Sequence, residues 1–336
     1  QQAGDAAARV YATPEAVAQY GQAVQLARQI DVGGEALTAL YTRLGRALEL
    51  NSEYDRALST YREMEGLARQ QDDRSMILAS LVARLTIQAV PGATHDPDAA
   101  ESVGERALAL SRELDARAVE ARVLWVLAVA AFWTGRLADA IERGERALAL
   151  ARELDLREQM ARTLNDLGGL IYLHSGHISQ AIEALQEASE LWEELGNKPM
   201  LTDSLSGTST AYVFAGEYDR AIALSDEAFR ISQSIDNLWG QSYSRWKVGL
   251  AFWDRGEIGQ AIRTMETSIR LAETVGFLIP LTNTRTDLAA LYADLGAVAR
   301  GLEMARAALS VAKSEDYADR APALAVLAHL RLLNGD

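Results

Sequence analysis

The chain has 336 residues, of which 49% are hydrophobic and 24% are charged, the balance of a folded protein rather than a disordered one. Its formal net charge of −14 argues against binding to nucleic-acid phosphates or to an anionic membrane surface. The absence of cysteine excludes disulfides and thiolate zinc sites, and no apolar run reaches the roughly 18 residues that a membrane span needs.

A turn signal recurs along the chain with a nearly constant period. The first copy reads Asn-Ser-Glu-Tyr-Asp-Arg-Ala-Leu from Asn51, with Ser52 at the position that later copies give to glycine. The later glycines are spaced by 41, 40, 40, 40 and 39 residues. They are Gly135, Gly176, Gly216, Gly256, Gly296 and Gly335. A fixed period of this length is the signature of a solenoid built from structural repeats.

A second set of breaks falls midway between the glycine turns. Glycine, asparagine and aspartate suit the end of one helix and the cap of the next. These breaks lie near Asp72-Asp73, Asp115, Asp155, Gly196-Asn197, Asp236-Asn237 and Gly276. Each repeat is therefore predicted to be a helix of roughly 16 residues, a tight turn, a second helix of roughly 18 residues and a short link.

The repeats predict a single all-α domain over residues 1–336, with no strand pattern of useful length. One repeat carries a longer loop at Pro91–Asp98, interpreted as a tolerated surface insertion, with a helix starting near Asp96-Pro97. The predicted helix pairs cover about 35–72, 75–115, 117–155, 157–196, 198–236, 238–276 and 278–315, with partial units at 1–31 and 318–336. Because both ends resemble interrupted repeats, the chain is expected to be a domain excised from a longer protein.

Small residues recur at three fixed positions of the repeat, and an apolar residue follows each turn. Two helices can cross at the closest distances only where the side chains at the contact are small. In the fifth repeat these positions are Gly169, Tyr172, Gly176, Ile178, Ala181 and Ala188, and in the sixth Ser209, Tyr212, Gly216, Tyr218, Ala221 and Ala228.

This pattern resembles the tetratricopeptide repeat over nearly the whole chain, although the common repeat of that family is shorter, at about 34 residues. The resemblance implies an α-solenoid, a right-handed superhelix of antiparallel helix pairs in which the first helix of each pair lines a concave groove. Longer repeats of this kind look like the sensor regions of bacterial signal-transduction ATPases with numerous domains (STAND proteins), the peptide-sensing quorum regulators of Gram-positive bacteria, and kinesin light chains. The excess of arginine over lysine favours a bacterial source and the first of these groups.

Positions matching the groove can be assigned from the turn glycines. They are rich in aromatic residues, which offer a large contact area at little entropic cost. The predicted binding residues are Arg122, Trp125, Phe132, Trp133, Asp166, Leu170, His174, Thr210, Phe214, Tyr243, Trp246, Leu250 and Trp253. The alternative for Trp125, Trp246 and Trp253 is that they only fill space between repeats. Trp192 and Trp239 are assigned to packing.

Two functions remain open. The first is a non-catalytic sensor domain of a cytoplasmic bacterial signal-transduction or transcription regulator, which binds a peptide, a partner protein or a small effector and changes shape. The second is a constitutive scaffold that binds an extended peptide or helix without switching. Self-association through the helix at 319–333 is a weaker third possibility.

No enzyme chemistry is predicted. The only neighbouring histidines, His174 and His177, straddle the turn at Gly176 instead of sharing a helix face, so no metal site is expected. No phosphate-binding loop is present, and Gly168-Gly169 is interpreted as a close-packing point inside a helix. No cofactor, membrane or direct nucleic-acid partner is predicted.

Overall fold

The computed structural model describes residues 13–30, 33–91, 94–312 and 320–335, and these residues form helices and short turns without a strand. The sequence prediction of an all-α helical-repeat solenoid is confirmed. The predicted partial units at 1–31 and 318–336, the last pair at 278–315 and the proposed self-association helix fall in part on residues 1–12, 31, 313–319 and 336, which lie outside the described residues.

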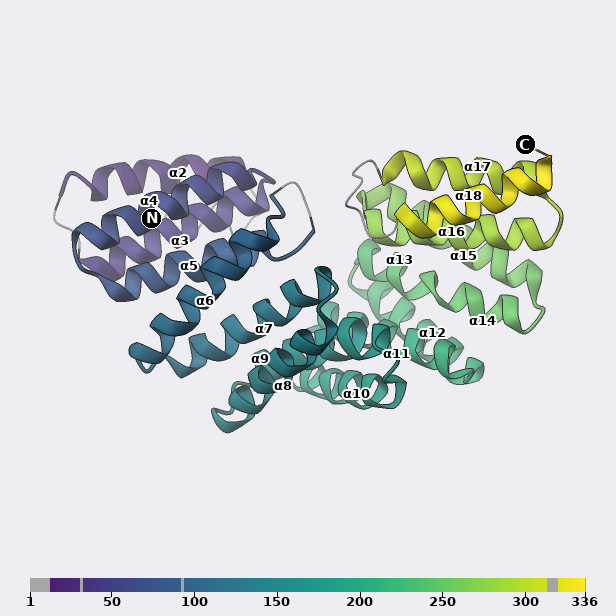
Figure 1. The fold of residues 1–336 in the computed structure, drawn as a ribbon, viewed down its shortest axis with the longest axis horizontal. Helices are drawn as coiled ribbons and strands as arrows, with labels where there is room; N and C mark the ends of the chain where they lie inside the picture. The colour runs from purple at the N-terminus through teal and green to yellow at the C-terminus, as the bar shows by residue number, and fades with distance from the viewer. Residues whose placement is uncertain (1–12, 31–32, 92–93, 313–319, 336) are drawn as a thin grey trace. The chain divides into compact units, whose positions relative to one another are not determined.

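The chain divides into two compact units, residues 1–159 and residues 160–336. Unit 1 contains α2 (Thr13–Ala27), α3 (Gly34–Leu50), α4 (Tyr54–Gln70), α5 (Arg74–Gln88), α6 (Pro97–Glu113), α7 (Arg117–Trp133) and α8 (Leu137–Glu153). Each helix packs on the next, and α3, α5 and α7, the first helices of successive pairs, also contact one another in sequence (Figure 1).

Helix α9 (Arg157–Asp166) begins just before the boundary between the units. Unit 2 continues with η1 (Leu167–Tyr172), α10 (Ile178–Glu194), α11 (Lys198–Ala215), α12 (Tyr218–Ser234), α13 (Leu238–Trp246), α14 (Val248–Asp254), α15 (Ile258–Val275), α16 (Leu278–Asp294), α17 (Val298–Val311) and α18 (Arg320–Asn334). The first-helix segments η1, α11, α13 and α16 contact one another in that order.

A residue with positive φ follows most of these helices. Glycine occupies it at Gly135, Gly176 and Gly216, while Ser52 and Asp115 adopt φ of 60° and 53°. The amide that follows donates to the carbonyl five residues earlier, as from Arg136 to Ala131 and from Glu217 to Tyr212, both at 2.9 Å. This Schellman geometry satisfies carbonyls that a helix end would leave without a partner. Both predicted sets of turns are thereby confirmed.

The longer loop before α6 also ends as the sequence predicts. Asp96 caps the helix, because its Oδ1 accepts a hydrogen bond of 3.0 Å from the Ala99 amide, and Pro97 occupies the first turn, where its missing N–H costs nothing.

Glycines sit where helices approach most closely. A Cβ at Gly45 would lie 2.2 Å from the Tyr61 ring, and a Cβ at Gly249 would lie 2.6 Å from Met265 Cγ. In the fifth repeat, the close-approach residue is Gly168 of the predicted Gly168-Gly169 packing point, and not Gly169, which the repeat pattern places at the contact. A Cβ at Gly168 would lie 2.9 Å from the Ala181 carbonyl oxygen, whereas a Cβ at Gly169 would meet nothing nearer than 3.8 Å.

The π-helical turn η1 explains this shift of one residue. From Asp115 to Gly296 the positive-φ residues are spaced by 20, except that 21 residues separate Asp155 from Gly176. A π turn holds one residue more than an α turn. The extra residue between these two breaks therefore lies in η1. As a result, residues before η1 are shifted by one in the repeat register when they are counted back from the turn at Gly176.

Deletion of Gly169 should convert η1 into an ordinary α-helical turn. The spacing from Asp155 to Gly176 would become 20, so we expect the free energy of unfolding to stay within about 1 kcal/mol of the parent value or to rise. Deletion of Ala130 from the regular helix α7 is the control, and it should cost more than about 3 kcal/mol because it misaligns buried side chains. Urea denaturation measures both, and equal losses would contradict the interpretation of η1.

Candidate functional site

The predicted residues of unit 1 lie along α7, which is buried on most of its circumference. Arg122 is exposed, whereas Trp125 is partly buried against the apolar core that α5, α6 and α7 share. Phe132 and Trp133 are also partly buried and meet edge to face, with ring centroids 5.0 Å apart. These contacts give Trp125 a packing role; whether it also touches a ligand stays a prediction.

Three predicted residues of unit 2 lie at exposed or locally bonded positions. His174 is exposed, and its Nδ1 lies 2.7 Å from the Leu170 carbonyl one turn earlier. Phe214 is 57% exposed at the end of α11. The Thr210 hydroxyl donates to the Ser206 carbonyl at 3.0 Å, which leaves mainly its methyl group for contacts.

Three others are partly buried. Leu250 and Trp253 on α14 pack against the core formed with α15 and α16, and Leu250 also contacts the neighbouring core around Tyr212. Leu170 lies within η1. For Trp253 this packing is what the space-filling alternative requires, and the role of all three residues in binding stays a prediction.

The remaining predicted residues of unit 2, Asp166, Tyr243 and Trp246, come together with residues that were not selected. We call this group the acid–aromatic cluster. It consists of Asp166, Asp203, Trp239, Tyr243, Trp246 and Phe277. The cluster draws on the first helices of consecutive pairs, from the end of α9 through α11 and α13, and on the residue that precedes α16.

Asp203 is held in place by a short chain of hydrogen bonds. Asn165 donates from Nδ2 to Asp203 Oδ2 at 2.8 Å, and the Ser204 hydroxyl donates to Asn165 Oδ1 at 2.6 Å. Asn165 and Ser204 are both buried, so this arrangement fixes the carboxyl group of α11 against the end of α9.

Burial raises the pKa of Asp203 to about 7, and the negative charge of Asp166 adds to this increase, while the hydrogen bond from Asn165 partly offsets it. The pKa of Tyr243 is raised as well, first by burial and then by the charges of Asp203 and Asp166. Both carboxyl groups therefore lie near the Tyr243 phenol, and their negative charges would favour a positive group beside them.

Aromatic rings gather beside Tyr243. Trp239 stacks on Phe277 with centroids 4.6 Å apart, and Tyr243 lies 5.2 Å from Trp239 and 5.8 Å from Trp246. The indole Nε1 of Trp246 is buried and has no hydrogen-bond partner. The Nζ of Lys247 lies 4.6 Å from the centroid of the Trp246 ring. It also forms an ion pair with Oδ2 of Asp287 at 3.0 Å.

The predicted binding residues do not include Asp203, Trp239 or Phe277 of the cluster, nor Asn165, which donates a hydrogen bond to Asp203. Trp239 is assigned to packing from the sequence, and its ring does stack on Phe277, although the residue is 37% exposed. Asn165 was missed because the extra residue of η1 displaces the repeat register before Gly176. The 21-residue spacing from Asp155 to Gly176 was the signal that could have revealed it.

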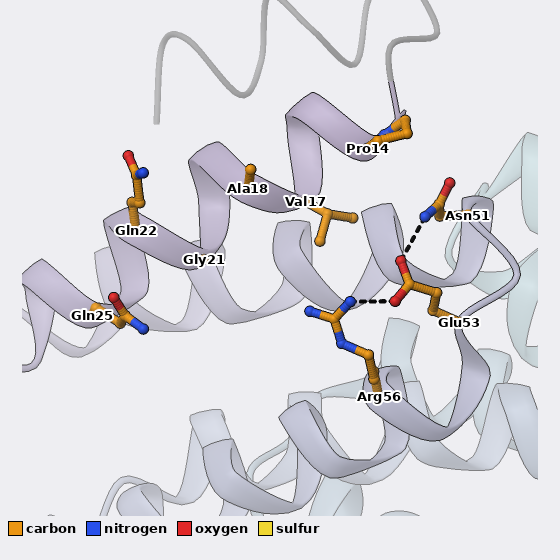
Figure 2. Close-up of a pocket in the computed structure, with 9 residues that line it drawn as sticks. All are labelled: Pro14, Val17, Ala18, Gly21, Gln22, Gln25, Asn51, Glu53 and Arg56. Atoms are coloured by element: carbon orange, nitrogen blue, oxygen red, sulfur yellow. Dashed lines mark hydrogen bonds and ion pairs between the residues drawn. The ribbon is translucent and has the colours of Figure 1, made fainter.

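Two open hollows of about 450 Å³ lie away from the predicted residues. One in unit 1 lies between α2 and the turn before α4. There Glu53 accepts hydrogen bonds from Asn51 and Arg56 (Figure 2). The other, in unit 2, surrounds the turn from Gly216 to Arg220 and includes Arg255.

Within the described residues, no three histidine, aspartate or glutamate side chains are grouped so that they could hold a metal ion. None of the described helices combines the length and the apolar character that a membrane crossing requires.

The sequence profile of the tetratricopeptide repeat family matches residues 119–194 and 159–234. Residues 119–234 are tetratricopeptide repeats. These TPR repeats include η1, α11 and α12, so part of the acid–aromatic cluster lies on them. No curated protein matches the chain in sequence.

Solved structures share the TPR fold at low sequence identity. The apo form of RapI has a TM-score of 0.69 and 16% identity, covering 82% of this chain and 97% of RapI. The Rap conjugation gene regulator of plasmid pLS20, in complex with the Phr* peptide, has a TM-score of 0.58 and 16% identity. The match covers 93% of this chain and 72% of the regulator. The STAND protein PH0952 from Pyrococcus horikoshii, described as having a TPR sensor, has a TM-score of 0.55 and 14% identity. The match covers 94% of this chain and 49% of PH0952.

Asp203→Asn should change how stability depends on pH. The folded chain holds the Asp203 proton up to about pH 7, whereas the unfolded chain releases it near the ordinary pKa of 3.8. The stability that Asp203 contributes is therefore present at low pH and is lost as pH rises through this window. Allowing for the partial exposure of Asp203, the variant should gain about 2 kcal/mol relative to the parent between about pH 4 and pH 7.5.

Urea denaturation at several pH values measures this difference. Asp219→Asn, at a side chain that is 93% exposed, is the control and should stay within about 0.5 kcal/mol of the parent. A pH-independent difference between Asp203→Asn and the parent would contradict the raised pKa of Asp203.

Proposed function

We propose that the chain is a non-catalytic TPR binding module whose acid–aromatic cluster takes a short peptide or a segment of a partner protein. The observation that carries this proposal is the convergence of two carboxyl groups and several aromatic rings on the first helices of unit 2. Rings provide contact area, and carboxylates select a basic side chain or a terminal amine.

The electrostatics of Asp203 support a cationic group in the ligand. Without a ligand, Asp203 is largely protonated below about pH 7 because its charged form is buried near Asp166. A guanidinium or ammonium group beside it would stabilise the carboxylate, and the carboxyl group would then release its proton. The Nε1 of Trp246 is buried without a partner, so a peptide carbonyl could accept its hydrogen bond only if binding opens the side chains around it.

We further propose that the module is the sensor of a larger, cytoplasmic bacterial signal-transduction or transcription regulator. The structural likeness to a STAND protein with a TPR sensor and to a Rap regulator in complex with a peptide supports this assignment. Two interruptions of first helices, η1 and the break at Lys247 between α13 and α14, border the cluster and favour a sensor that changes shape.

The alternative is a constitutive scaffold that binds a partner segment without switching. It predicts binding at the same cluster with no change in the helix interruptions. Circular dichroism of the free and peptide-bound chain separates the two, because conversion of η1 to an α-helical turn would add helical signal only in the sensor.

Binding can be tested with acetylated pentapeptide mixtures that carry one fixed central residue, either arginine, leucine or glutamate. We expect the arginine mixture to bind most tightly and Asp203→Asn to weaken it by about tenfold, because the variant cannot supply a carboxylate. Asp219→Asn is the matched control and should bind like the parent. Calorimetry in buffers of different ionisation enthalpy should detect proton release at pH 6.

Equal binding of the three mixtures, or unchanged binding by Asp203→Asn, would reject the acid–aromatic cluster as the site. The absence of proton release would leave binding intact but reject the assignment of Asp203 as the group that receives the cation.

A further inference from the structure

Unit 1 contains a concentration of arginine side chains in a chain whose net charge is −14. At its centre is Glu65 of α4, which is 5% exposed and accepts hydrogen bonds from three guanidinium groups. Arg69 and Arg106 donate to Oε1, both at 2.5 Å, and Arg84 donates to Oε2. One carboxylate thus faces three positive charges, which come from α4, α5 and α6.

The positive charge in this group exceeds the negative charge. Arg62 on α4 also acts on Arg84, and together with Arg106 it disfavours the charged form of that side chain. Burial is the main reason why the pKa of Arg84 is lowered, and Glu65 only partly offsets it. Burial alone would raise the pKa of Glu65, but its hydrogen bond to Arg106 and the nearby arginine charges lower it.

The surplus charge is accessible to a partner. The side chains of Arg69 and Arg106 are 59% and 44% exposed, whereas Arg84 is 13% exposed. Arg62 is exposed too, and no acidic group among the described residues pairs with it. Each exposed guanidinium keeps N–H donors that do not point at Glu65, since a guanidinium carries five.

The arrangement suits several carboxylates better than one compact anion. Glu65 already occupies the point where the guanidinium groups converge, and its charge would repel a phosphate placed there. The outward donors are spread over α4 and α6, which a chain of separate acidic side chains can follow. Bidentate pairing with carboxylates is the interaction for which arginine is best shaped.

We propose that Arg62, Arg69 and Arg106 form a docking surface on unit 1 for an acidic segment of a partner protein. This surface is separate from the acid–aromatic cluster of unit 2. It takes a negatively charged segment, whereas the cluster takes a positively charged one. Glu65 holds two of the three arginines in position, and Arg84 supports Glu65 from below the surface.

Fluorescein-labelled hexaglutamate is a suitable probe, measured by fluorescence anisotropy on the full chain at low salt. We expect saturable binding, which the double variant Arg69→Gln/Arg106→Gln weakens by about tenfold while the Arg84–Glu65 pair remains. The matched control Arg146→Gln/Arg152→Gln removes the same charge from α8 and should bind within about twofold of the parent. Thermal unfolding of both variants verifies that they are folded.

Three outcomes would overturn the proposal. The first is no binding of hexaglutamate at low salt. The second is an equal loss in the α8 control, which would indicate attraction by overall charge. The third is tighter binding of pyrophosphate or of a single-stranded oligonucleotide than of hexaglutamate, since each would identify a phosphate site instead of a surface for acidic protein segments.

Discussion

A residue with positive φ, in the left-handed backbone conformation, follows nearly every helix, and the rest of the structure depends on this constraint. It allows the chain to reverse within two or three residues, and the Schellman hydrogen bonds around it satisfy the last carbonyls of the helix. Because it recurs every 20 residues over most of the chain, successive helical segments between these residues have nearly the same length, and each repeat presents the same faces. Small residues such as Gly45 and Gly249 then allow those faces to approach closely.

The candidate site lies where this regularity is relaxed. The π-helical turn η1 accommodates the extra residue before Gly176. The first helix of a later pair is interrupted at Lys247, between α13 and α14. Around these points the core uses hydroxyl groups in place of larger apolar side chains. Ser242 and Ser268 each donate to the other's carbonyl oxygen at 3.0 Å, which joins α13 to α15. Such contacts fix the position of α13 on α15 by hydrogen bonding while burying little apolar surface.

The sequence was sufficient for the fold because its turns have strong local chemistry. Positive φ favours glycine and tolerates aspartate, so Gly135 and Asp115 identify helix ends without any tertiary information. The same period-based reasoning failed at η1. A one-residue insertion is absorbed within a helix by hydrogen bonding, which shifts the contact from Gly169 to Gly168 and brings Asn165 towards Asp203.

The candidate site could be predicted only in part. Asp166, Tyr243 and Trp246 are predicted groove residues that the structure brings together in the acid–aromatic cluster, and their role in binding stays a prediction. Burial of an individual ring depends on side-chain packing across helices, which a repeat period does not encode. Trp239, which the sequence assigns to packing, does stack on Phe277, yet the residue remains 37% exposed.

The central claim is that ligands bind the first helices of unit 2 at the acid–aromatic cluster. Hydrogen–deuterium exchange of the chain, with and without the tightest-binding pentapeptide, tests it most directly. The account predicts that protection is greatest in residues 163–172, 200–210 and 239–250, and that the amides of η1 exchange faster than those of α7 in the free chain. Protection confined to α8, α10 or α12, with none in these three segments, would contradict it.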